Sequence, residues 1–179
     1  IQEVLDTKLT IEDGSGVHGD PDKTGEIVFD KVSFRYPDAE EDVLKDISFT
    51  AGKGETVALI GATGCGKSTV INLIPRFYDA TEGTVSVDGV NVKDYSEKEL
   101  RNKIGYVSQK ATLFTGTIES NVAYGDNGQK NASETDIKKA LDIAQASEFV
   151  DSLEDGSKAY VAQGGSNFSG GQKQRMSIA

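Results

Sequence analysis

The sequence lacks tryptophan and contains only one cysteine, one histidine and one methionine among its 179 residues. The single cysteine, Cys65, excludes an internal disulfide framework and suits a reducing compartment. No apolar run approaches the roughly 20 residues that a helix needs to cross a bilayer. The first ten residues mix charged with apolar side chains, unlike a signal peptide. We therefore expect a soluble cytoplasmic domain.

Positive charge is also scarce. The sequence contains 19 lysines and arginines and 29 aspartates and glutamates, which gives a net charge of −10. Partners that are rich in phosphate require a basic surface patch. The charge balance therefore argues against nucleic acid as a partner. The length fits one domain, and a hydrophobic content of 36% is ordinary for a globular protein.

The first 25 residues are expected to form a tether and linker, because the stretch from Glu12 to Gly25 is rich in glycine, aspartate, serine, threonine and proline. A domain is expected to begin at Glu26. Strand-forming residues predict strands at 27–34 (with a bulge), 43–50, 56–60, 83–87 and 104–107. The stretches 56–60 and 104–107 are apolar enough to predict buried strands of an α/β sheet.

Helices are expected where polar capping residues or glycines precede apolar residues at helical spacing. The first should begin near Lys67, with Val70, Ile71 and Ile74 on one side, and Ser96 with Glu99 should cap a short second one. Ser133 should cap a helix that carries Ile137, Ala140, Leu141 and Ala144. Ser147 should cap a further short helix that runs to Leu153. Asp88-Gly89 predicts a hairpin turn after the fourth strand.

A glycine-rich loop lies between the predicted strand 56–60 and the helix at Lys67. It matches the pattern G-x-x-x-x-G-K-[ST] with Gly61, Ala62, Thr63, Gly64, Cys65, Gly66, Lys67 and Ser68, and Thr69 follows. Glycines let successive backbone N–H groups approach a polyphosphate closely. Lys67 would hold the β- and γ-phosphates, and the Ser68 hydroxyl would bind Mg²⁺. This pattern predicts phosphate binding but is shared by kinases, GTPases, motors and transporter ATPases.

A second motif begins at Phe168 and contains Ser169, Gly170, Gly171 and Gln172. A serine followed by two glycines can open a helix whose N–H groups and hydroxyl form a second anion site. In order and spacing, the two motifs resemble those of ATP-binding cassette (ABC) transporters. The second motif is similar to their signature, usually written LSGGQ, with Phe168 in the first position.

The resemblance gives roles to two further residues. Gln109, after Val107 and Ser108, matches the Q-loop glutamine, which implies contact with Mg²⁺ and the attacking water. Without the resemblance, a polar residue that caps the strand would be the preferred interpretation of Gln109. Tyr36 lies where the family places an aromatic side chain that stacks on adenine, although an isolated tyrosine at a strand end is more often packing. Lys67 and Gln109 are the catalytic candidates, and Ser68 and Gln109 the metal ligands.

Other stretches are similar to the exporter branch of the family. The run 113–118 with Asn121 resembles the segment after the exporter Q-loop, and 160–165 resembles the X-loop. Gln163 stands where exporters usually carry glutamate. Residues 3–6 resemble the tether to a transmembrane domain. The resemblance implies that the same polypeptide contains a transmembrane domain. It also implies that the nucleotide-binding domain itself lies on the cytoplasmic face of the cell membrane.

The fold implied by the resemblance is α/β: a P-loop NTPase core with an antiparallel β subdomain and an α-helical subdomain. Residues 26–108 would form the β and P-loop core, 109–168 the Q-loop and helical subdomain, and 169–179 the start of the signature helix. Two such domains would pair head to tail, with ATP between the phosphate loop of one and the signature of the other.

Family members continue past the signature with a Mg-associated aspartate, a catalytic glutamate and a switch histidine. This sequence ends at Ala179, and its one histidine, His18, lies in the expected linker. We therefore expect the C-terminal part of the core to be missing and these residues alone to hydrolyse ATP poorly or not at all. The alternative that this chain is the catalytically degenerate, regulatory half of a heterodimeric exporter is left open. A DNA-repair or chromosome-maintenance ATPase is disfavoured, since no heptad run separates Gln109 from Ser169.

Overall fold

The computed structural model describes residues 11–125 and 132–179, so the expected tether at 3–6 lies outside the described residues. The chain divides into two compact units, Ile1–Gly105 and Tyr106–Ala179, and each is described by itself. Within the described ranges, no helix combines the length and hydropathy that membrane crossing requires.

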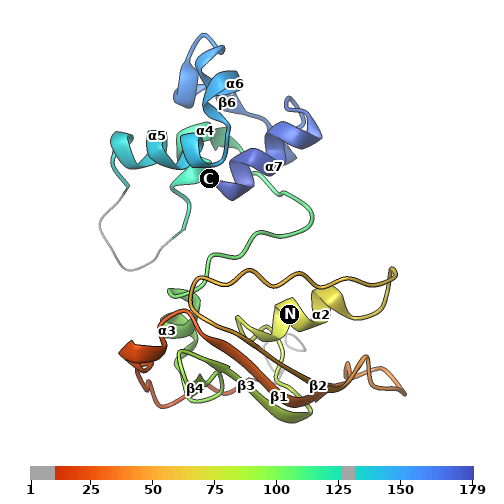
Figure 1. Cartoon of the computed structure of the whole chain (residues 1–179). Coiled ribbons are helices and arrows are strands. Elements are labelled where there is room, and N and C mark those ends of the chain that lie inside the picture. The colour runs from red at the N-terminus through yellow and green to blue at the C-terminus, as the bar shows by residue number, and fades with distance from the viewer. Residues whose placement is uncertain (1–10, 126–131) are drawn as a thin grey trace, which may run out of the picture. The chain divides into compact units, whose positions relative to one another are not determined.

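Unit 1 is built on an antiparallel sheet of four strands (Figure 1). The strands are β1 (Ile27–Phe34), β2 (Leu44–Ala51), β3 (Glu82–Val87) and β4 (Val90–Asn91), in the order β2-β1-β3-β4. The strands expected at 27–34, 43–50 and 83–87 are confirmed to within one residue. The bulge in β1 is also confirmed, because its register with β2 shifts between Phe29 and Val32.

The turn between β3 and β4 is the expected hairpin. Asp88 and Gly89 have φ angles of 50° and 75°, and Val87 pairs directly with Val90. Positive φ at both central residues gives the turn a twist that matches the strands, which explains why the Asp-Gly pair predicts it.

In the described part of unit 1 the helices are η1 (Pro21–Lys23), α2 (Lys67–Leu73) and α3 (Glu97–Arg101). Helix α2 begins at Lys67, as expected. Of the three apolar residues expected on one side, Val70 is buried and Ile74 packs partly buried against the core, but Ile71 was predicted wrongly. Val70 and Leu73 are buried, whereas Ile71 is 44% exposed. Helix α3 has the expected cap, in which the Ser96 hydroxyl accepts from the Glu99 N–H group.

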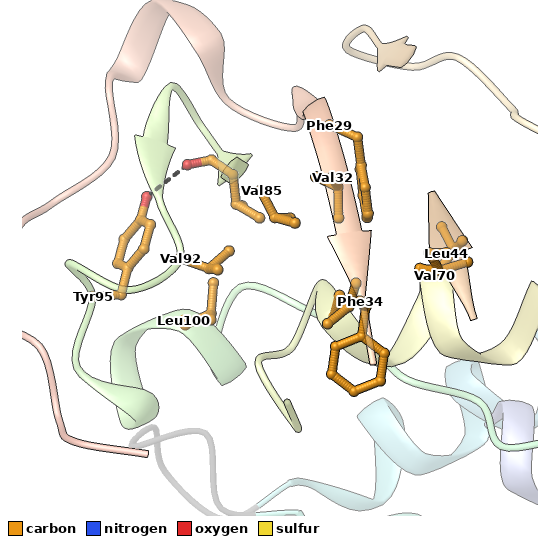
Figure 2. Close-up of a cluster of buried hydrophobic side chains, with 11 residues drawn as sticks. Phe29, Val32, Phe34, Leu44, Val70, Val85, Val92, Tyr95 and Leu100 are labelled. Atoms are coloured by element: carbon orange, nitrogen blue, oxygen red, sulfur yellow. Dashed lines mark hydrogen bonds between the residues drawn. The ribbon is translucent and has the colours of Figure 1, made fainter. Parts of the chain in front are cut away.

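The core of unit 1 lies between the sheet and helices α2 and α3, as Figure 2 shows. Phe29, Val32 and Phe34 from β1 meet Val70 from α2, and all four are buried. Tyr95 is fully buried, and its hydroxyl donates to the Val87 carbonyl at 3.0 Å. That hydrogen bond satisfies the one polar atom that the ring brings into the core.

The stretch expected as a linker is packed along unit 1 where the structure describes it. The Gly14 N–H group donates to the Tyr95 carbonyl at 3.1 Å, and the Asp13 carboxylate accepts from the Glu97 N–H group at 2.7 Å. A Cβ on Gly14 would lie 2.3 Å from the Tyr95 carbonyl oxygen, so only glycine allows this approach.

A buried carboxylate ties the end of this stretch to the sheet. Asp88 accepts from the Gly25 N–H group at 2.7 Å and from the Lys103 ammonium at 2.8 Å. Burial by itself raises the pKa of a carboxyl group, but these two hydrogen bonds together hold the pKa of Asp88 below its ordinary value. The ion pair therefore strengthens the attachment at neutral pH.

The two buried strands expected at 56–60 and 104–107 are wrong. Both stretches lie outside helices and strands, and Ile60 is 95% exposed. An apolar strand is stable only where neighbouring strands bond its backbone and other elements cover its faces. No described segment pairs with either stretch. Their hydropathy therefore does not make them strands here.

The described part of unit 2 is mainly helical and contains one two-stranded antiparallel pair, β5 (Gly116–Thr117) with β6 (Tyr160–Val161). Its helices are α4 (Ile118–Val122), α5 (Glu134–Ile143), α6 (Ser147–Asp151), η2 (Gly156–Lys158), η3 (Gln163–Gly165) and α7 (Gly170–Ile178). Its core has no buried aromatic ring among the described residues and includes Leu113, Ile118, Leu141, Val150, Val161 and Met176.

Helix α5 begins with a complete capping box, in which Ser133 and Asp136 each bond the other's backbone N–H group. This confirms the cap expected at Ser133. The cap expected at Ser147 is wrong, because Ala146 precedes α6 and Ser147 is its first residue. The Ser147 hydroxyl instead donates to the Asp142 carboxylate.

Candidate functional site

The glycine-rich loop leads directly into α2, and its residues 61–65 are exposed. Two of its glycines have backbone conformations that side chains disfavour, with φ of 84° at Gly64 and 91° at Gly66. A Cβ on Gly66 would lie 2.7 Å from the Leu44 side chain. Gly66 thus serves both the turn of the loop and the close packing of α2 against β2.

The Lys67 side chain folds back into the loop. Its ammonium group donates to the carbonyls of Gly61 at 2.9 Å and Ala62 at 2.7 Å, and lies 3.6 Å from the Cys65 sulfur. A positive charge is thus held against the concave side of the loop backbone. The same charge could move by side-chain rotation toward an anion bound there.

The start of α2 lacks a side-chain cap. Gly66 is the capping residue and offers no side chain, and the first hydrogen bond of the helix runs from the Val70 N–H group to the Gly66 carbonyl at 3.0 Å. The N–H groups of Lys67, Ser68 and Thr69 therefore have no partner within the helix. They point their positive ends to the same place as the Lys67 charge.

Tyr36 and Thr69 are brought together, although 33 residues separate them. Their hydroxyl oxygens lie 3.1 Å apart in a hydrogen bond. Thr69 is only 5% exposed, whereas Tyr36 is half-buried beside the core of unit 1. The expected adenine platform and the first turn of the helix after the phosphate loop are therefore linked directly.

The expected metal ligands belong to different units. Ser68 lies in unit 1 with an exposed side chain, and Gln109 lies in unit 2 at an exposed bend beyond Ser108. The described ranges contain no cluster of three or more histidine, cysteine, aspartate or glutamate residues that could hold a metal ion. A metal here would need oxygens from a bound phosphate, which is how Mg²⁺ is commonly held beside nucleotides.

The signature motif starts α7 with a capping box. The Ser169 hydroxyl accepts from the Gln172 N–H group at 3.3 Å, and the Gln172 side-chain oxygen accepts from the Ser169 N–H group at 2.9 Å. Neither Gly170 nor Gly171 has any neighbouring atom within 4 Å of a built Cβ. The motif thus presents an open backbone surface on a helix end that its own side chains hold in shape.

The stretch similar to the X-loop is bound to the signature helix within unit 2. Lys173 donates to the Gly164 carbonyl at 3.3 Å. Asn167 bridges the same stretch, because its side chain donates to the Tyr160 carbonyl and accepts from the Ala162 N–H group. Movement of this loop would therefore act on α7.

The sequence interpretation missed two aromatic residues beside these motifs. Tyr78 packs against Tyr36 with the ring centroids 5.2 Å apart, and Tyr124 stacks on Phe114 at 4.4 Å. No local sequence pattern predicts these two contacts, because each joins residues that are not neighbours in the sequence. The only available signal is the rarity of aromatic residues, 7% of the chain.

The phosphate loop fits the polyphosphate that its sequence implies. The donors at the site are backbone N–H groups and one ammonium group, and no carboxylate is hydrogen-bonded to the loop among the described residues. The Ser68 hydroxyl, exposed beside them, suits a hard cation bound to the same anion. The donor set therefore favours an anionic ligand with a bound Mg²⁺.

Comparisons with known proteins identify the family. A family model described as ABC transporter matches residues 44–179. A putative multidrug export ATP-binding/permease protein of Staphylococcus aureus (strain NCTC 8325) is 44% identical over 177 residues, which is 99% of this chain and 30% of that protein. ABC transporter B family member 21 of Arabidopsis thaliana is 45% identical over 159 residues, 88% of this chain and 12% of that protein.

A solved structure agrees with these relatives. The structure of a bacterial Atm1-family ABC exporter with ATP bound superposes with a TM-score of 0.88 at 33% identity, and covers 99% of this chain and 30% of that one. The mixed α/β fold is therefore confirmed as that of an ABC ATPase domain. Since the family model matches most of its length, the chain belongs to the ABC transporter family.

Proposed function

We propose that this chain is the ATP-binding domain of an exporter and that it supplies the ATP-driven step of transport from the cytoplasmic face of a cell membrane. The observation that carries the proposal is the uncapped start of α2, where unpaired N–H groups and the Lys67 charge converge on the phosphate loop. The Atm1-family neighbour, whose structure holds ATP, supports ATP as the ligand.

In this proposal each residue of the loop has a separate task. The backbone from Gly61 to Gly66 encloses the phosphates, Lys67 leaves its carbonyl partners to neutralise the terminal phosphates, and Ser68 binds Mg²⁺. Tyr36 stacks on adenine. Gln109 would contact Mg²⁺ and orient the attacking water. Phosphate transfer requires mainly positioning and charge neutralisation, which these groups offer.

The signature residues are proposed to act on a nucleotide held by a second nucleotide-binding domain, identical or related, in a head-to-tail pair. Their capping box supports this role. Ser169 and Gln172 use acceptor oxygens in the cap, so the serine hydroxyl hydrogen and the glutamine NH₂ group can still donate to phosphate. A helix start held in shape reduces the ordering cost of that contact.

An exposed aromatic surface of unit 2 supports a second partner, the membrane domain present in the fused relatives. Phe114 and Tyr124 stack with an interplanar angle of 21°, and Tyr160 is exposed on β6. The Asn121 side chain bonds both backbone groups of Phe114, at 2.7 and 2.9 Å, which fixes the stack. Rigid exposed aromatic residues are typical of protein contacts.

A titration of MgATP tests the proposal, with the full-length protein and its Lys67→Ala variant. Loss of one charge-assisted contact should weaken binding by roughly 10- to 100-fold. Lys45→Ala is the matched control, because it removes the same charge from an exposed position of β2. Equal affinity in the Lys67 and Lys45 variants would refute phosphate binding by this loop.

Labelling of Cys65 gives an independent test. Its thiol is exposed and lies inside the loop that the phosphates would fill. We expect an alkylating reagent to modify Cys65 readily without nucleotide, and MgATP to slow the reaction at least about tenfold through occlusion. Labelling at one rate in both conditions would count against the site.

A further inference from the structure

Tyr78 has no role in the proposed function, yet it contacts the residue assigned to the base. It lies in the connection between α2 and β3 and is 38% exposed. Its ring meets that of Tyr36 almost at right angles, with an interplanar angle of 87° and the centroids 5.2 Å apart. This is the edge-to-face geometry that aromatic pairs favour.

Phe34 completes a group of three rings. It is buried at the end of β1 and meets Tyr36 at 4.8 Å and 84°, and Tyr78 at 5.5 Å and 52°. Tyr36 therefore has two perpendicular aromatic neighbours, one in the core and one at the surface. Together they restrict the tilt of a ring that is otherwise half-buried.

The backbone that carries Tyr78 is held by a buried guanidinium group. Arg76 is 4% exposed and has a φ of 56°. Its side chain binds both carboxylate oxygens of Asp79, at 2.8 and 3.3 Å, and donates to the Lys93 carbonyl at 3.2 Å. Arg76 and Asp79 lie on either side of Tyr78 in the sequence, so their bidentate ion pair limits the conformations of the connection.

A second set of bonds ties the same connection to the end of β1. The Thr81 N–H group donates to the Ser33 carbonyl at 2.9 Å, and the Arg35 N–H group donates to the Thr81 hydroxyl at 3.0 Å. These bonds place the residues before Tyr36 beside those after Tyr78. The contact between the two rings is therefore built into the backbone rather than made by two loose surface side chains.

The Tyr36 hydroxyl is held on another side by Thr69, in the first turn of α2. Three neighbours, Phe34, Tyr78 and Thr69, thus determine where the Tyr36 ring lies relative to the phosphate loop. A ring that is already placed loses little freedom when a base stacks on it.

We propose that Tyr78 is a positioning residue that orients Tyr36 for the base of a purine nucleotide. This inference depends on the proposed function, in which Tyr36 stacks on adenine. Tyr78 contributes to the affinity for the base and not to the affinity for the phosphates. Its ring contacts are with Tyr36 and Phe34, and among the described residues no hydrogen bond joins it to the phosphate loop.

The test compares two ligands on the full-length protein by calorimetric titration: MgATP, and magnesium tripolyphosphate, which lacks base and sugar. Tyr78→Leu should weaken MgATP binding about three- to tenfold, the usual effect of losing an edge-to-face aromatic pair. Binding of tripolyphosphate should not change. Tyr78→Phe keeps the ring and should bind both ligands like the wild type. Tyr78→Met, which fills a similar volume without a ring, replaces Tyr78→Leu if that variant does not fold.

Phe77→Leu is the matched control. Phe77 is a neighbouring aromatic residue of similar exposure, 40%, but its ring lies 5.7 Å from the Arg101 guanidinium carbon. It should bind MgATP and tripolyphosphate like the wild type. An equal loss of MgATP affinity in Phe77→Leu and Tyr78→Leu would overturn the proposal.

A double-mutant cycle with Tyr36→Ala completes the test. If Tyr78 acts through Tyr36, Tyr78→Leu has no further effect once Tyr36 is absent. A persistent effect, or an equal loss for both ligands, would overturn the positioning role alone. If Tyr36→Ala binds MgATP like the wild type, the adenine platform itself fails, and the role of Tyr78 with it. Failure of phosphate binding by the loop can be distinguished from these outcomes, because it would appear in the titration with tripolyphosphate and in the affinity of the Lys67→Ala variant.

Discussion

The starts of α2 and α7 contain similar residues, yet they are completed differently. Each combines glycine with serine at the beginning of a helix. At α7 the side chains of Ser169 and Gln172 bond the first N–H groups, whereas at α2 the capping residue is Gly66 and no side chain does so. In place of a cap, α2 has the Lys67 ammonium beside it.

The difference indicates two ways to prepare a helix start for an anion. The N–H groups at α2 remain without helix partners, so a ligand can satisfy them and gain the full benefit of that contact. The capping box of α7 bonds the N–H groups of Ser169 and Gln172 and leaves those of Gly170 and Gly171 open, so a ligand would add contacts to a preformed surface. Four substitutions or conditions, from the largest expected effect to the smallest, can break or sharpen this comparison.

Gly66→Ala should have the largest effect on stability. A left-handed conformation costs a residue with a Cβ about 1–2 kcal/mol, and the added atom would also lie 2.7 Å from Leu44. We expect the opening free energy of α2, measured by hydrogen exchange, to fall by about 2–3 kcal/mol. Gly54→Ala, with a φ of 76° and no atom within 4 Å, should show only the backbone cost. Unchanged protection of α2 would contradict the packing argument.

Ser169→Ala should destabilise α7 by about 1 kcal/mol, because it removes the hydroxyl acceptor of the capping box. Hydrogen exchange of residues 170–178 measures the change. Ser169→Asp should restore most of the protection, since a carboxylate also accepts at this position. Ser68→Ala should leave exchange of α2 unaltered, and a comparable loss there would erase the contrast between the two helix starts.

Gly171→Ala should act in the opposite direction from Gly66→Ala. Nothing lies within 4 Å of a Cβ at this position, and its backbone is helical. Alanine loses less backbone entropy than glycine, so α7 should gain about 0.5 kcal/mol of stability. Hydrogen exchange again measures the change. A clear loss of protection would mean that the open surface of the signature depends on glycine for folding as well as for access.

Acid should weaken the cap of α5 but not that of α7. The hydrogen bonds from the Ser133 hydroxyl, and then from its N–H group, lower the pKa of Asp136. A lowered pKa stabilises the fold above the ordinary aspartate pKa of about 3.9, and that contribution is lost as the pH falls through the folded value. Exchange of α5 should therefore accelerate below about pH 4 relative to α7, whose cap uses the neutral Gln172. Asp136→Asn should remove this difference in pH dependence.

Several features of both units could be predicted because their signals are local. The hairpin at Asp88-Gly89 and the start of α2 after Gly66 depend on backbone angles that few residues adopt. The cap at Ser133 depends on a bond over three residues. Such features need no information about distant parts of the chain.

The wrong predictions concern features that depend on distant partners. Residues 56–60 read as a strand, but a strand requires neighbours, and the described chain has none beside it. The predicted face of α2 failed at Ile71 because the position of the sheet, and not the helix period, decides which side is buried. The cap at Ser147 failed because packing with the preceding helix starts α6 at Ser147 itself, where its hydroxyl donates to Asp142.

The sequence by itself determined the order of the two glycine motifs, the turns and caps around them, and the resemblance that the family match confirms. The tertiary structure alone decided that Lys67 rests on the loop carbonyls and that Tyr36 lies between Phe34, Tyr78 and Thr69. The physical reason is range. Dihedral preferences and capping bonds act within a few residues, whereas ring contacts and strand pairing depend on how distant segments fold together.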